Sequence, residues 1–431
     1  MHHGVQPDRA DVDKIIRKIS LLHSVSAETP TDTRLVQEVV DSLDINWNNS
    51  DLKFYDPACG RGNFLLVLFK KLLEHGHTPE HIVTNMLYGS DISFVQSAIA
   101  TKALMLISNV TPNIYTEDAL VKEETMKFDC VITNPPYQNP GKSRGQKLWY
   151  KFVFKCNNLV KDDGYLAMVT PTSWIRGGVN HGKEGVLKDI FGKKQLVVAA
   201  FDNITKKYFP KVGIDIGWWV MKNEPVHTKT KMILQDCVKH IDLKDVEVMS
   251  PVADSRAIGI LEKFIDDRHK KEDIIYFNYK NPDLDIESSE ATATHSVKHW
   301  VHGCTQKSND TYTYLESRFN DKLDFKKIMF VIGSRYWQPQ VDMQGLGVVA
   351  QGFAIPIKDN WTKPGILSVY ESKLWRLINF NFQLQQNGFM KNAIVRKTPA
   401  MDMSKVWTDD EIYKHFGFTQ DEIDYIEDLV K

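Results

Sequence analysis

The chain has 431 residues, a length that predicts two domains rather than one. Its hydrophobic content of 42% and charged content of 25% are those of a globular protein, and they exclude a disordered chain. The formal net charge is −1, so a surface for a polyanion has to arise from a local excess of basic residues.

Hydropathy and cysteine content indicate the cellular compartment in which the protein is expected. No stretch approaches the roughly 20 apolar residues of a membrane span, and the N-terminus lacks the apolar core of a signal peptide. The five cysteines include no Cys-x-x-Cys pair, which argues against a structural zinc and for a reducing compartment. We therefore expect a cytoplasmic protein without membrane contact.

The chain begins with a predicted amphipathic arm, residues 1–25, that contains a helix from Asp11 to Leu22. Residues 26–33 are rich in side chains that cap helix N-termini, and they predict a second helix that ends near Leu43.

The next segment carries the first motif. Residues 54–56 predict a strand that ends in Asp56, Gly60 and Gly62 predict a tight turn, and residues 64–73 predict a helix. Such a turn brings backbone amides and a helix N-terminus close to a ligand.

Two further acids follow at the ends of predicted strands. Asp91 lies 35 residues after Asp56, where a carboxylate can accept hydrogen bonds from both hydroxyls of a ribose. Asp118 ends a later strand and could accept a hydrogen bond from an adenine amino group. Each acid alone would be explained as a cap at a helix or turn. The ordered series favours a nucleoside-binding site.

The tetrapeptide Asn134-Pro135-Pro136-Tyr137 follows a buried-looking strand over residues 129–133. The prolines fix φ near −65° and have no N–H, so their carbonyls are available as hydrogen-bond acceptors. Asn134 adds a side-chain carbonyl, and Tyr137 adds a flat face for stacking. These groups suit an exocyclic amine on a planar ring. Asn-Pro-Pro also occurs in ordinary turns, so the tetrapeptide gains its meaning from the acids upstream.

The pattern of strands predicts an α/β fold with a doubly wound sheet, because helical segments separate most of the strand-like runs. The last two runs are joined by a short Lys/Pro-containing link and are expected to form an antiparallel hairpin. The seven runs are residues 53–56, 87–90, 113–116, 128–133, 164–170, 195–201 and 214–221.

Basic residues concentrate directly after the tetrapeptide. Residues 142–211 contain 14 Lys or Arg and 5 Asp or Glu, an excess of +9, whereas residues 402–431 contain 3 and 9, a deficit of −6. Lys142 and Arg144 belong to a Gly-containing loop that could order on a phosphate backbone. A solvated helix face and a plain surface loop are the alternatives for this segment.

The remainder of the chain changes character after Pro225. Residues 226–400 mix short β-type runs, loops and many aromatic side chains, and two helices at the end each begin with a capping box, Thr408 with Glu411 and Thr419 with Glu422. His295, His299 and His302 have a helical spacing that metal ligands can use. An aromatic side chain, Trp300, lies between them, so we expect no metal and a surface or DNA-facing cluster instead.

These motifs resemble the adenine-N6 DNA methyltransferases of the γ arrangement, in which the cofactor motifs precede the catalytic motif and the DNA-reading region comes last. The resemblance rests on Asp56-Pro57-Ala58-Cys59-Gly60-x-Gly62-x-Phe64 and on Asn134-Pro135-Pro136-Tyr137, and it extends over about residues 26–225. It implies a Rossmann-like, seven-stranded methyltransferase domain at 26–225. It also implies a mixed α+β target-recognition domain at 226–431, which ends in the acidic helices.

The resemblance implies S-adenosyl-L-methionine as the cofactor and double-stranded DNA as the partner. A target adenine inside a duplex has to be flipped out and held between flat surfaces. Tyr137 is one such surface, and Phe209 matches the family's later aromatic-Pro motif, although a core position is the alternative for it. Lys142 and Arg144 are the expected phosphate contacts. The expected cofactor residues are Thr29, Asp56, Ala58, Gly60, Gly62, Asp91, Ile92, Asp118, Ala119, Asn134 and Phe152.

Three functions stay open at this point. The preferred one is sequence-specific methylation of adenine N6 in DNA, with room for a cognate restriction endonuclease encoded separately. A methyltransferase that acts on RNA or on a protein glutamine is the second, but such enzymes usually lack the roughly 200 residues that follow the catalytic region here. A DNA-recognition or modification subunit of a larger restriction-modification complex is the third. The sequence indicates neither the recognition site nor the oligomeric state.

Overall fold

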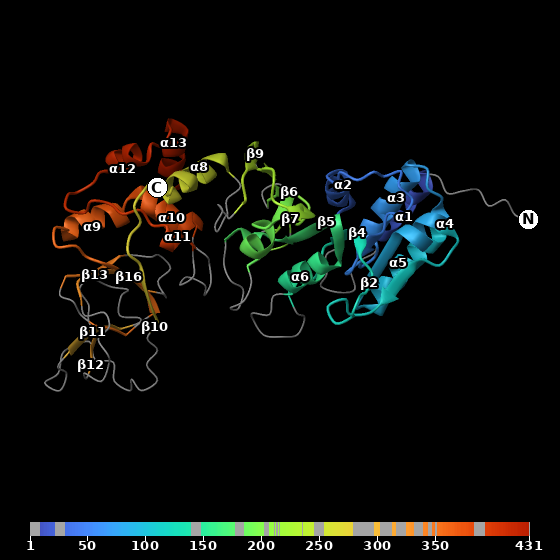
Figure 1. Cartoon of the computed structure of the whole chain (residues 1–431), viewed down its shortest axis with the longest axis horizontal. Helices are drawn as coiled ribbons and strands as arrows, with labels where there is room; N and C mark the ends of the chain where they lie inside the picture. Colours follow the sequence, from blue (N-terminus) through green and yellow to red (C-terminus); the bar gives the residue numbers. More distant parts are fainter. Residues whose placement is uncertain are drawn as a thin grey trace, which may run out of the picture. The chain divides into compact units, whose positions relative to one another are not determined.

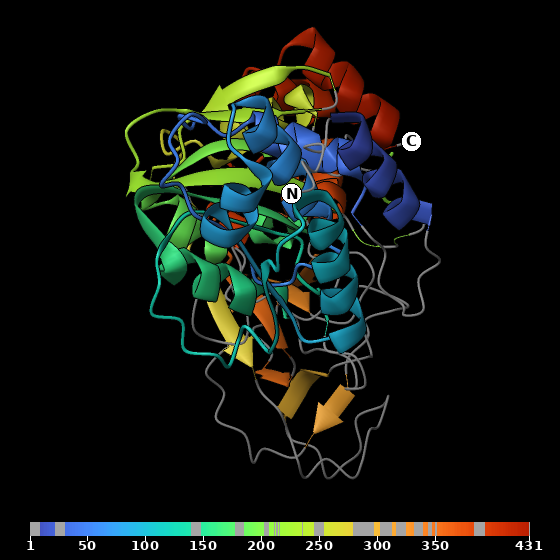
Figure 2. The ribbon, with the colours of Figure 1, turned by 90° about the vertical axis from the view of Figure 1, so that its right-hand side faces the viewer.

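A computed structural model of the chain divides into two compact units, Met1–Trp174 with Glu184–Glu247 and Ile175–Lys183 with Val248–Lys431 (Figures 1 and 2). Each unit is described by itself. The residues that the structure describes are 9–21, 31–138, 148–176, 185–201, 207–210, 212, 214, 216–234, 236–244, 254–278, 297–301, 313–315, 325–331, 339–343, 347–349, 351–382 and 393–430.

The first unit is built on a nine-stranded sheet in the order β3-β2-β1-β4-β5-β7-β6-β8-β9. In this order, each pair of neighbours from β3 through β2, β1 and β4 to β5 is parallel. Strand β7 is antiparallel to both of its neighbours, β5 and β6. All seven predicted runs are strands, and the predicted terminal hairpin is β6 with β7. The Rossmann-like α/β sheet is thus confirmed. The bounds are β1 Phe54–Asp56, β2 Leu87–Asp91, β3 Asn113–Thr116, β4 Phe128–Thr133, β5 Val160–Pro171, β6 Lys194–Ala200, β7 Ile216–Pro225, β8 Thr230–Ile233 and β9 Val238–Ile241.

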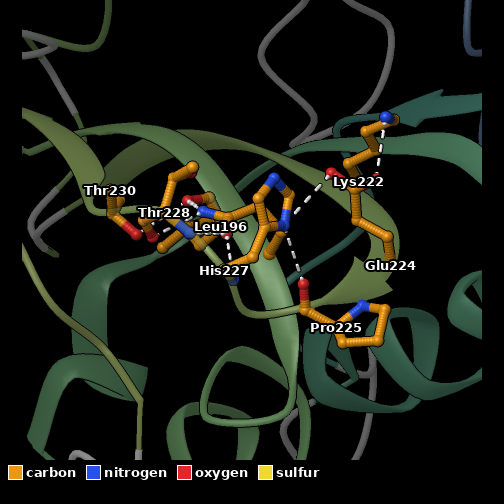
Figure 3. Close-up of polar contacts among 8 residues, drawn as sticks. Leu196, Lys222, Glu224, Pro225, His227, Thr228 and Thr230 are labelled. Carbon is orange, nitrogen blue, oxygen red and sulfur yellow. Dashed lines mark hydrogen bonds and ion pairs between the residues drawn. The ribbon is translucent and has the colours of Figure 1, made fainter.

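The sheet continues past Pro225, where the sequence predicted a domain boundary. The buried Gln195 side chain holds the turn after β7, since its Oε1 accepts hydrogen bonds from the backbone amides of His227 and Thr228 at 3.0 Å each. His227 also lies within hydrogen-bonding distance of the Pro225 carbonyl, and Thr230 donates to the carbonyl of Leu196 (Figure 3). The turn directs the chain into β8 beside β6, so the first unit extends to Glu247 and not to 225.

Helices cover both faces of the sheet, as in a doubly wound fold. One apolar cluster joins helices α1, α2, α3 and α5 to alternate strand residues such as Cys130 and Ile132. Val131, between them, is buried outside that cluster, on the face where α6 packs against β4 and β5. The helices and helical turns of this unit are α1 Arg9–Leu21, α2 Thr33–Asp41, α3 Asn63–Glu74, α4 Pro79–His81, η1 Ile82–Met86, α5 Phe94–Ser108, α6 Trp149–Leu159 and η3 Leu187–Phe191, with η2 Thr172–Arg176 at the division between units.

The first helix is part of the core and not a separate arm. Val12 and Ile19 on one face of α1 are buried in the apolar cluster, and α1 contacts both α3 and α5. An ion pair between Asp13 and Lys70 of α3 joins the polar side of the contact at 2.5 Å. The predicted arm at 1–25 therefore contributes its helix to the first unit, because the apolar stripe of an amphipathic helix is stable only when it is covered.

The second unit is mixed α+β, with a four-stranded sheet β10-β16-β13-β14 and a three-stranded sheet β12-β11-β15. Both predicted capping boxes are confirmed at the starts of α12 and α13. His299 lies in strand β11 and not on a helix, and His295 and His302 lie outside the described residues. The bounds are β10 Ile275–Asn278, β11 Val297–Val301, β12 Thr313–Leu315, β13 Lys327–Val331, β14 Gln340–Asp342, β15 Gly347–Val349, β16 Gln351–Pro356, α8 Ser255–Ile265, α9 Lys363–Tyr370, α10 Lys373–Phe382, α11 Ala393–Arg396, α12 Asp409–Phe416 and α13 Gln420–Leu429.

A buried ion pair lies in the core of the second unit. The Lys327 Nζ is 2.6 Å from Asp342 Oδ2, both side chains are 0% exposed, and Nζ also donates to the Phe325 carbonyl. The two residues are register partners in the β13–β14 ladder. Breaking such a pair leaves a charge in an apolar core, which costs far more free energy than the pair itself contributes.

We predict that Asp342→Asn lowers the free energy of unfolding by about 3 kcal/mol or more, because the Lys327 ammonium loses its counter-charge. The double variant Lys327→Met with Asp342→Asn should recover at least half of that loss. Glu411→Gln is the matched control, since the Lys405–Glu411 pair is half exposed and 3.3 Å long, and it should change stability by less than about 1 kcal/mol. Urea denaturation measures all three. A double variant less stable than Asp342→Asn would contradict the prediction.

Candidate functional site

The predicted site residues converge because their strands are neighbours. Strands β3, β2, β1 and β4 are adjacent and parallel, so their carboxyl ends lie at one edge of the sheet. Asp56 is the last residue of β1 and Asp91 is the last residue of β2. Asn134 directly follows β4. The topology therefore brings Asp56, Asp91 and Asn134, which belong to three separate segments of the sequence, to one edge of the sheet.

The turn after β1 has the backbone conformation that its glycines were expected to provide. Gly60 has φ of +52° and Gly62 has φ of +88°, both in the left-handed region that favours glycine. The Gly60 amide donates to Asp91 Oδ2 at 2.9 Å, and the Ser93 amide donates to Asp91 Oδ1 at 2.8 Å. Asp91 thus fixes the glycine turn against the end of β2. Each of its oxygens keeps a further lone pair for another donor.

Burial sets the protonation of the two acids. Asp56 is 1% exposed, and its Oδ1 accepts a hydrogen bond from the Ala58 amide at 3.1 Å. Desolvation raises the pKa of Asp56 to about 7, the hydroxyl of Thr133 and the Ala58 amide oppose this rise, and the charge of Asp91 adds to it. Burial also raises the pKa of Asp91, against the effect of its two backbone donors. A ligand that brings positive charge to this edge would favour the ionised forms.

The third acid lies just after β3. Asp118 is half-buried and begins a turn, where its Oδ1 accepts a hydrogen bond from the Leu120 amide at 2.9 Å. Ala119 beside it is buried. Ile92, directly after Asp91, has an apolar side chain that is 71% exposed. An acceptor, a small buried residue and an exposed apolar side chain are suited to the edge and face of a purine ring.

The amide of Asn134 is held from both of its ends. Its Nδ2 donates to Thr31 Oγ1 at 2.9 Å, and its Oδ1 accepts a hydrogen bond from the Tyr137 hydroxyl at 2.8 Å. Thr31 is itself tied down, because Asn63 Nδ2 donates to its backbone carbonyl at 2.6 Å. Pro135 is buried. The segment before α2, the start of α3 and the end of β4 therefore meet at this asparagine.

The remaining predicted residues are placed as follows. Phe209 is buried, at 6% exposure, within the apolar cluster of the first unit, so an open stacking face would require it to move. Phe152 is buried in α6 at 5% exposure. Thr29, Lys142 and Arg144 lie outside the described residues.

Thr31 and Asn63 are site residues that sequence reasoning missed. Thr31 lies two residues after the predicted cofactor residue Thr29, and it directly precedes Asp32, the N-cap of α2. Asn63 opens α3 and is buried despite its polarity. A buried polar residue at the first position of an apolar helix is a weak signal of a long-range hydrogen bond, and it is the one signal that pointed here.

The described residues hold no group of three or more His, Cys, Asp or Glu side chains arranged to bind a metal ion. Within the same ranges, no helix combines the length and the apolar content needed to cross a membrane.

The glycine turn has room for a ligand. A Cβ built on Gly60 would meet no other atom within 4 Å, which leaves open space beside the buried Asp56 and the start of α3. Backbone amides, carboxylate acceptors and an exposed apolar side chain surround this edge. These groups together fit a nucleoside that carries positive charge, and the side-chain amide of Asn134 fits a planar amine.

Comparison with known proteins agrees with this geometry. The family model of the N-6 DNA methylases matches residues 29–289, more than half of the chain. The type II restriction enzyme and methyltransferase RM.BcgI of Heyndrickxia coagulans is 26% identical over 197 residues, which are 44% of this chain and 30% of that protein. The type II methyltransferase M.VspI of Vibrio sp. (strain 343) is 36% identical over 91 residues, 20% of each chain. The chain thus spans less than a third of these curated relatives.

Solved structures show a general likeness. The restriction-modification enzyme MmeI, in a complex with DNA, gives a TM-score of 0.44 at 13% identity, over 89% of this chain and 67% of that one. The M protein of the type I restriction enzyme EcoKI gives 0.39 at 18% identity, over 47% and 45%.

Because the folded-state pKa of Asp56 lies above its ordinary 3.8, the folded protein binds a proton that the unfolded chain releases. We therefore predict that stability falls as the pH rises from about 4 to about 7. Asp56→Asn should remove the part of this dependence that Asp56 contributes, while that of Asp91 remains, and the variant should be more stable than the wild type at pH 8. Denaturant unfolding of the ligand-free protein at pH 5 and pH 8 measures it, with the exposed Asp51→Asn as control. Parallel pH profiles for Asp56→Asn and the wild type would contradict the prediction.

Proposed function

The chain belongs to the N-6 DNA methylase family, and we propose that it transfers a methyl group from S-adenosyl-L-methionine to N6 of an adenine in double-stranded DNA. The observation that carries this proposal is the amide of Asn134. Its oxygen accepts a hydroxyl donor at 2.8 Å, at the same sheet edge as the glycine turn and the buried Asp56 and Asp91. An acceptor for an amine and hydrogen-bonding groups for a cationic nucleoside at one edge are what such a transfer requires.

The amine has to be made nucleophilic. The lone pair of an adenine N6 is delocalised into its ring, so the nitrogen attacks poorly when it is planar. When bound, S-adenosyl-L-methionine supplies an electrophilic methyl group on a sulfonium. The Asn134 side-chain oxygen and the Pro135 carbonyl would accept the two N6 hydrogens and favour a tetrahedral nitrogen. A fixed acceptor of this kind is worth about 3 kcal/mol, and correct orientation about 7–11 kcal/mol.

The cofactor would be held by the edge residues described above. In this proposal the Asp91 carboxylate accepts from the ribose hydroxyls, and Asp118 accepts from the adenine amino group. The Gly60–Gly62 turn approaches the methionine end, beside Asp56. The other residues that we assign to this pocket are Thr29, Ala58, Ile92, Ala119, Asn134 and Phe152.

The target base would have to leave the duplex before it reaches Asn134. We assign one stacking face to Tyr137, with Pro136 as part of the rigid rim. Phe209 is the second face if its segment moves out of the core on binding. Lys142 and Arg144 would contact the phosphate backbone, in the basic stretch of 142–211.

The second unit is proposed to read the DNA sequence, and the enzyme would act on DNA in the cytoplasm. The relatives also suggest a second arrangement. One of them is named as the methylase subunit of a type I restriction enzyme, MjaIX from Methanocaldococcus jannaschii, and it is 29% identical over 111 residues. In that arrangement this chain would be the modification subunit of a larger complex, and methylation would need a partner chain.

We predict that Asn134→Ala lowers methyl transfer to duplex DNA by at least about 100-fold, because the acceptor for N6 is lost. The assay follows label from tritiated S-adenosyl-L-methionine into unmethylated plasmid DNA, RNA and protein. Asn158→Ala, an exposed asparagine in α6, is the matched control and should keep wild-type activity. Label that reaches RNA or protein but never DNA would refute the proposed function. Label that reaches DNA only after a partner chain is added would favour the subunit arrangement.

We predict that Gly60→Ala weakens the binding of S-adenosyl-L-methionine at least roughly tenfold, because the new methyl group enters the proposed cofactor space. Gly76→Ala is a close control. Gly76 also has a left-handed φ, of +87°, and also has open space around its Cβ, but it lies between α3 and α4. Both variants should lose about 1 kcal/mol of stability from backbone strain. Calorimetry that finds equal cofactor affinity in the two variants would place the cofactor elsewhere.

A further inference from the structure

The orientation of the Asn134 amide matters as much as its presence. An asparagine amide has a donor end and an acceptor end of nearly equal shape, and a rotation of 180° exchanges them. With Oδ1 toward the target, the side chain accepts an amine hydrogen. With Nδ2 toward the target, two N–H donors would face two N–H donors. The chain therefore needs something that keeps the amide in one orientation.

Thr31 is placed to do this. Its Oγ1 lies 2.9 Å from Asn134 Nδ2 and accepts a hydrogen bond from it, although 103 residues separate the two in sequence. Thr31 is 9% exposed, and the hydrogen bond from Asn63 to its backbone carbonyl holds the segment in place. A hydroxyl can also donate, so Thr31 fixes the orientation of the amide together with a hydrogen-bond donor at the opposite end, which is Tyr137 here and the target amine in the complex. The opposite end provides the second constraint.

The Tyr137 hydroxyl occupies the acceptor end of the amide. It donates to Asn134 Oδ1 at 2.8 Å, and this is the hydrogen-bond position that an amine of the target would need. The two contacts are therefore unequal. Tyr137 has to give up its hydrogen bond when the target enters, whereas Thr31 can keep its own throughout. The contact that persists is the one that can hold the amide during the reaction.

We propose that Thr31 is a positioning residue that holds Asn134 with its oxygen toward the target amine. This inference rests on the proposed function. Thr31 touches Asn134 and does not itself act on the substrate. Loss of its hydroxyl leaves the amide free to rotate, so a smaller fraction of bound targets is aligned for transfer. The effect falls on the rate of the bound complex and not on the affinity for DNA or for the cofactor.

The test compares Thr31→Val, which keeps the shape and removes the hydroxyl, with Thr31→Ser, which restores the hydroxyl. We expect Thr31→Val to lower kcat by about tenfold, the range that one hydrogen bond supplies, with KM for DNA and Kd for S-adenosyl-L-methionine changed less than about twofold. Thr31→Ser should return kcat to within about threefold of the wild type. Thr230→Val is the matched control. Thr230 is a buried threonine with a hydroxyl bond to the Leu196 carbonyl, four strands away from β4 in the sheet.

A second readout does not depend on activity. In protein labelled with ¹⁵N at asparagine, the side-chain amide signals that disappear in Asn134→Ala identify Asn134. These signals should shift in Thr31→Val and stay close to the wild type in Thr31→Ser. If Thr31→Val folds poorly, Thr31→Ala takes its place. The comparison of Thr31→Ala with Thr31→Ser isolates the same hydroxyl, and the same Asn134 signals report on the amide.

The outcomes separate the two proposals. A wild-type protein that labels RNA or protein but never DNA, with or without a partner chain, would refute the proposed function. An active wild type in which Thr31→Val keeps wild-type kcat, or leaves the Asn134 signals unmoved, would refute the role of Thr31 alone. A Thr31→Val variant that loses cofactor affinity, without rescue of kcat by serine, would also refute it, since the residue would then act on the cofactor pocket.

Discussion

The site depends on the parallel pairing of β1 with β2 on one side and with β4 on the other. Parallel strands end at the same edge, so this pairing brings the last residues of three strands together without any contribution from the rest of the sheet. A one-residue slip of β4 against β1 would turn the side chains of β4 to the opposite faces and move Asn134 away from Asp56. The register of Cys130 and Val131 with Phe54 and Tyr55 is therefore a functional constraint as well as a structural one.

The same edge carries an electrostatic cost. The carboxyl groups of Asp56 and Asp91 lie at the ends of neighbouring strands there, and burial raises the pKa of both. Unfavourable charge of this kind persists in proteins where a ligand relieves it, and perturbed acids cluster at functional sites for that reason. A cationic cofactor would gain affinity from the very desolvation that destabilises the ligand-free protein. Binding of such a ligand to the folded state would therefore also stabilise the fold.

The sequence predicted the elements that have a clear hydrophobic pattern or clear turn residues at their ends. Strand β4 has the predicted bounds because it is a buried apolar run with clear turns on both sides. Strand β3 also has the predicted bounds, although its four residues are half-buried or exposed. Strands β8 and β9 were missed, since they are short and half-exposed and therefore show no continuous apolar run. His299 was placed on a helical face by its spacing, whereas the valines beside it, Val297 and Val301, favour the strand that is found.

Within the site, local motifs were readable and long-range contacts were not. The left-handed glycines, the edge acids and Asn134 are visible because each belongs to a short pattern with a physical meaning. The contact of Asn134 with Thr31 joins residues 103 positions apart, and the sequence around either residue does not predict the other.

The turn held by Gln195 has a further structural consequence. A polypeptide ending at 225 would lack β8, so β6 would present an open row of backbone N–H and C=O groups to solvent. Such an edge pairs readily with other chains, and the shortened protein would be prone to aggregation even though Asp56, Asp91 and Asn134 are all still present.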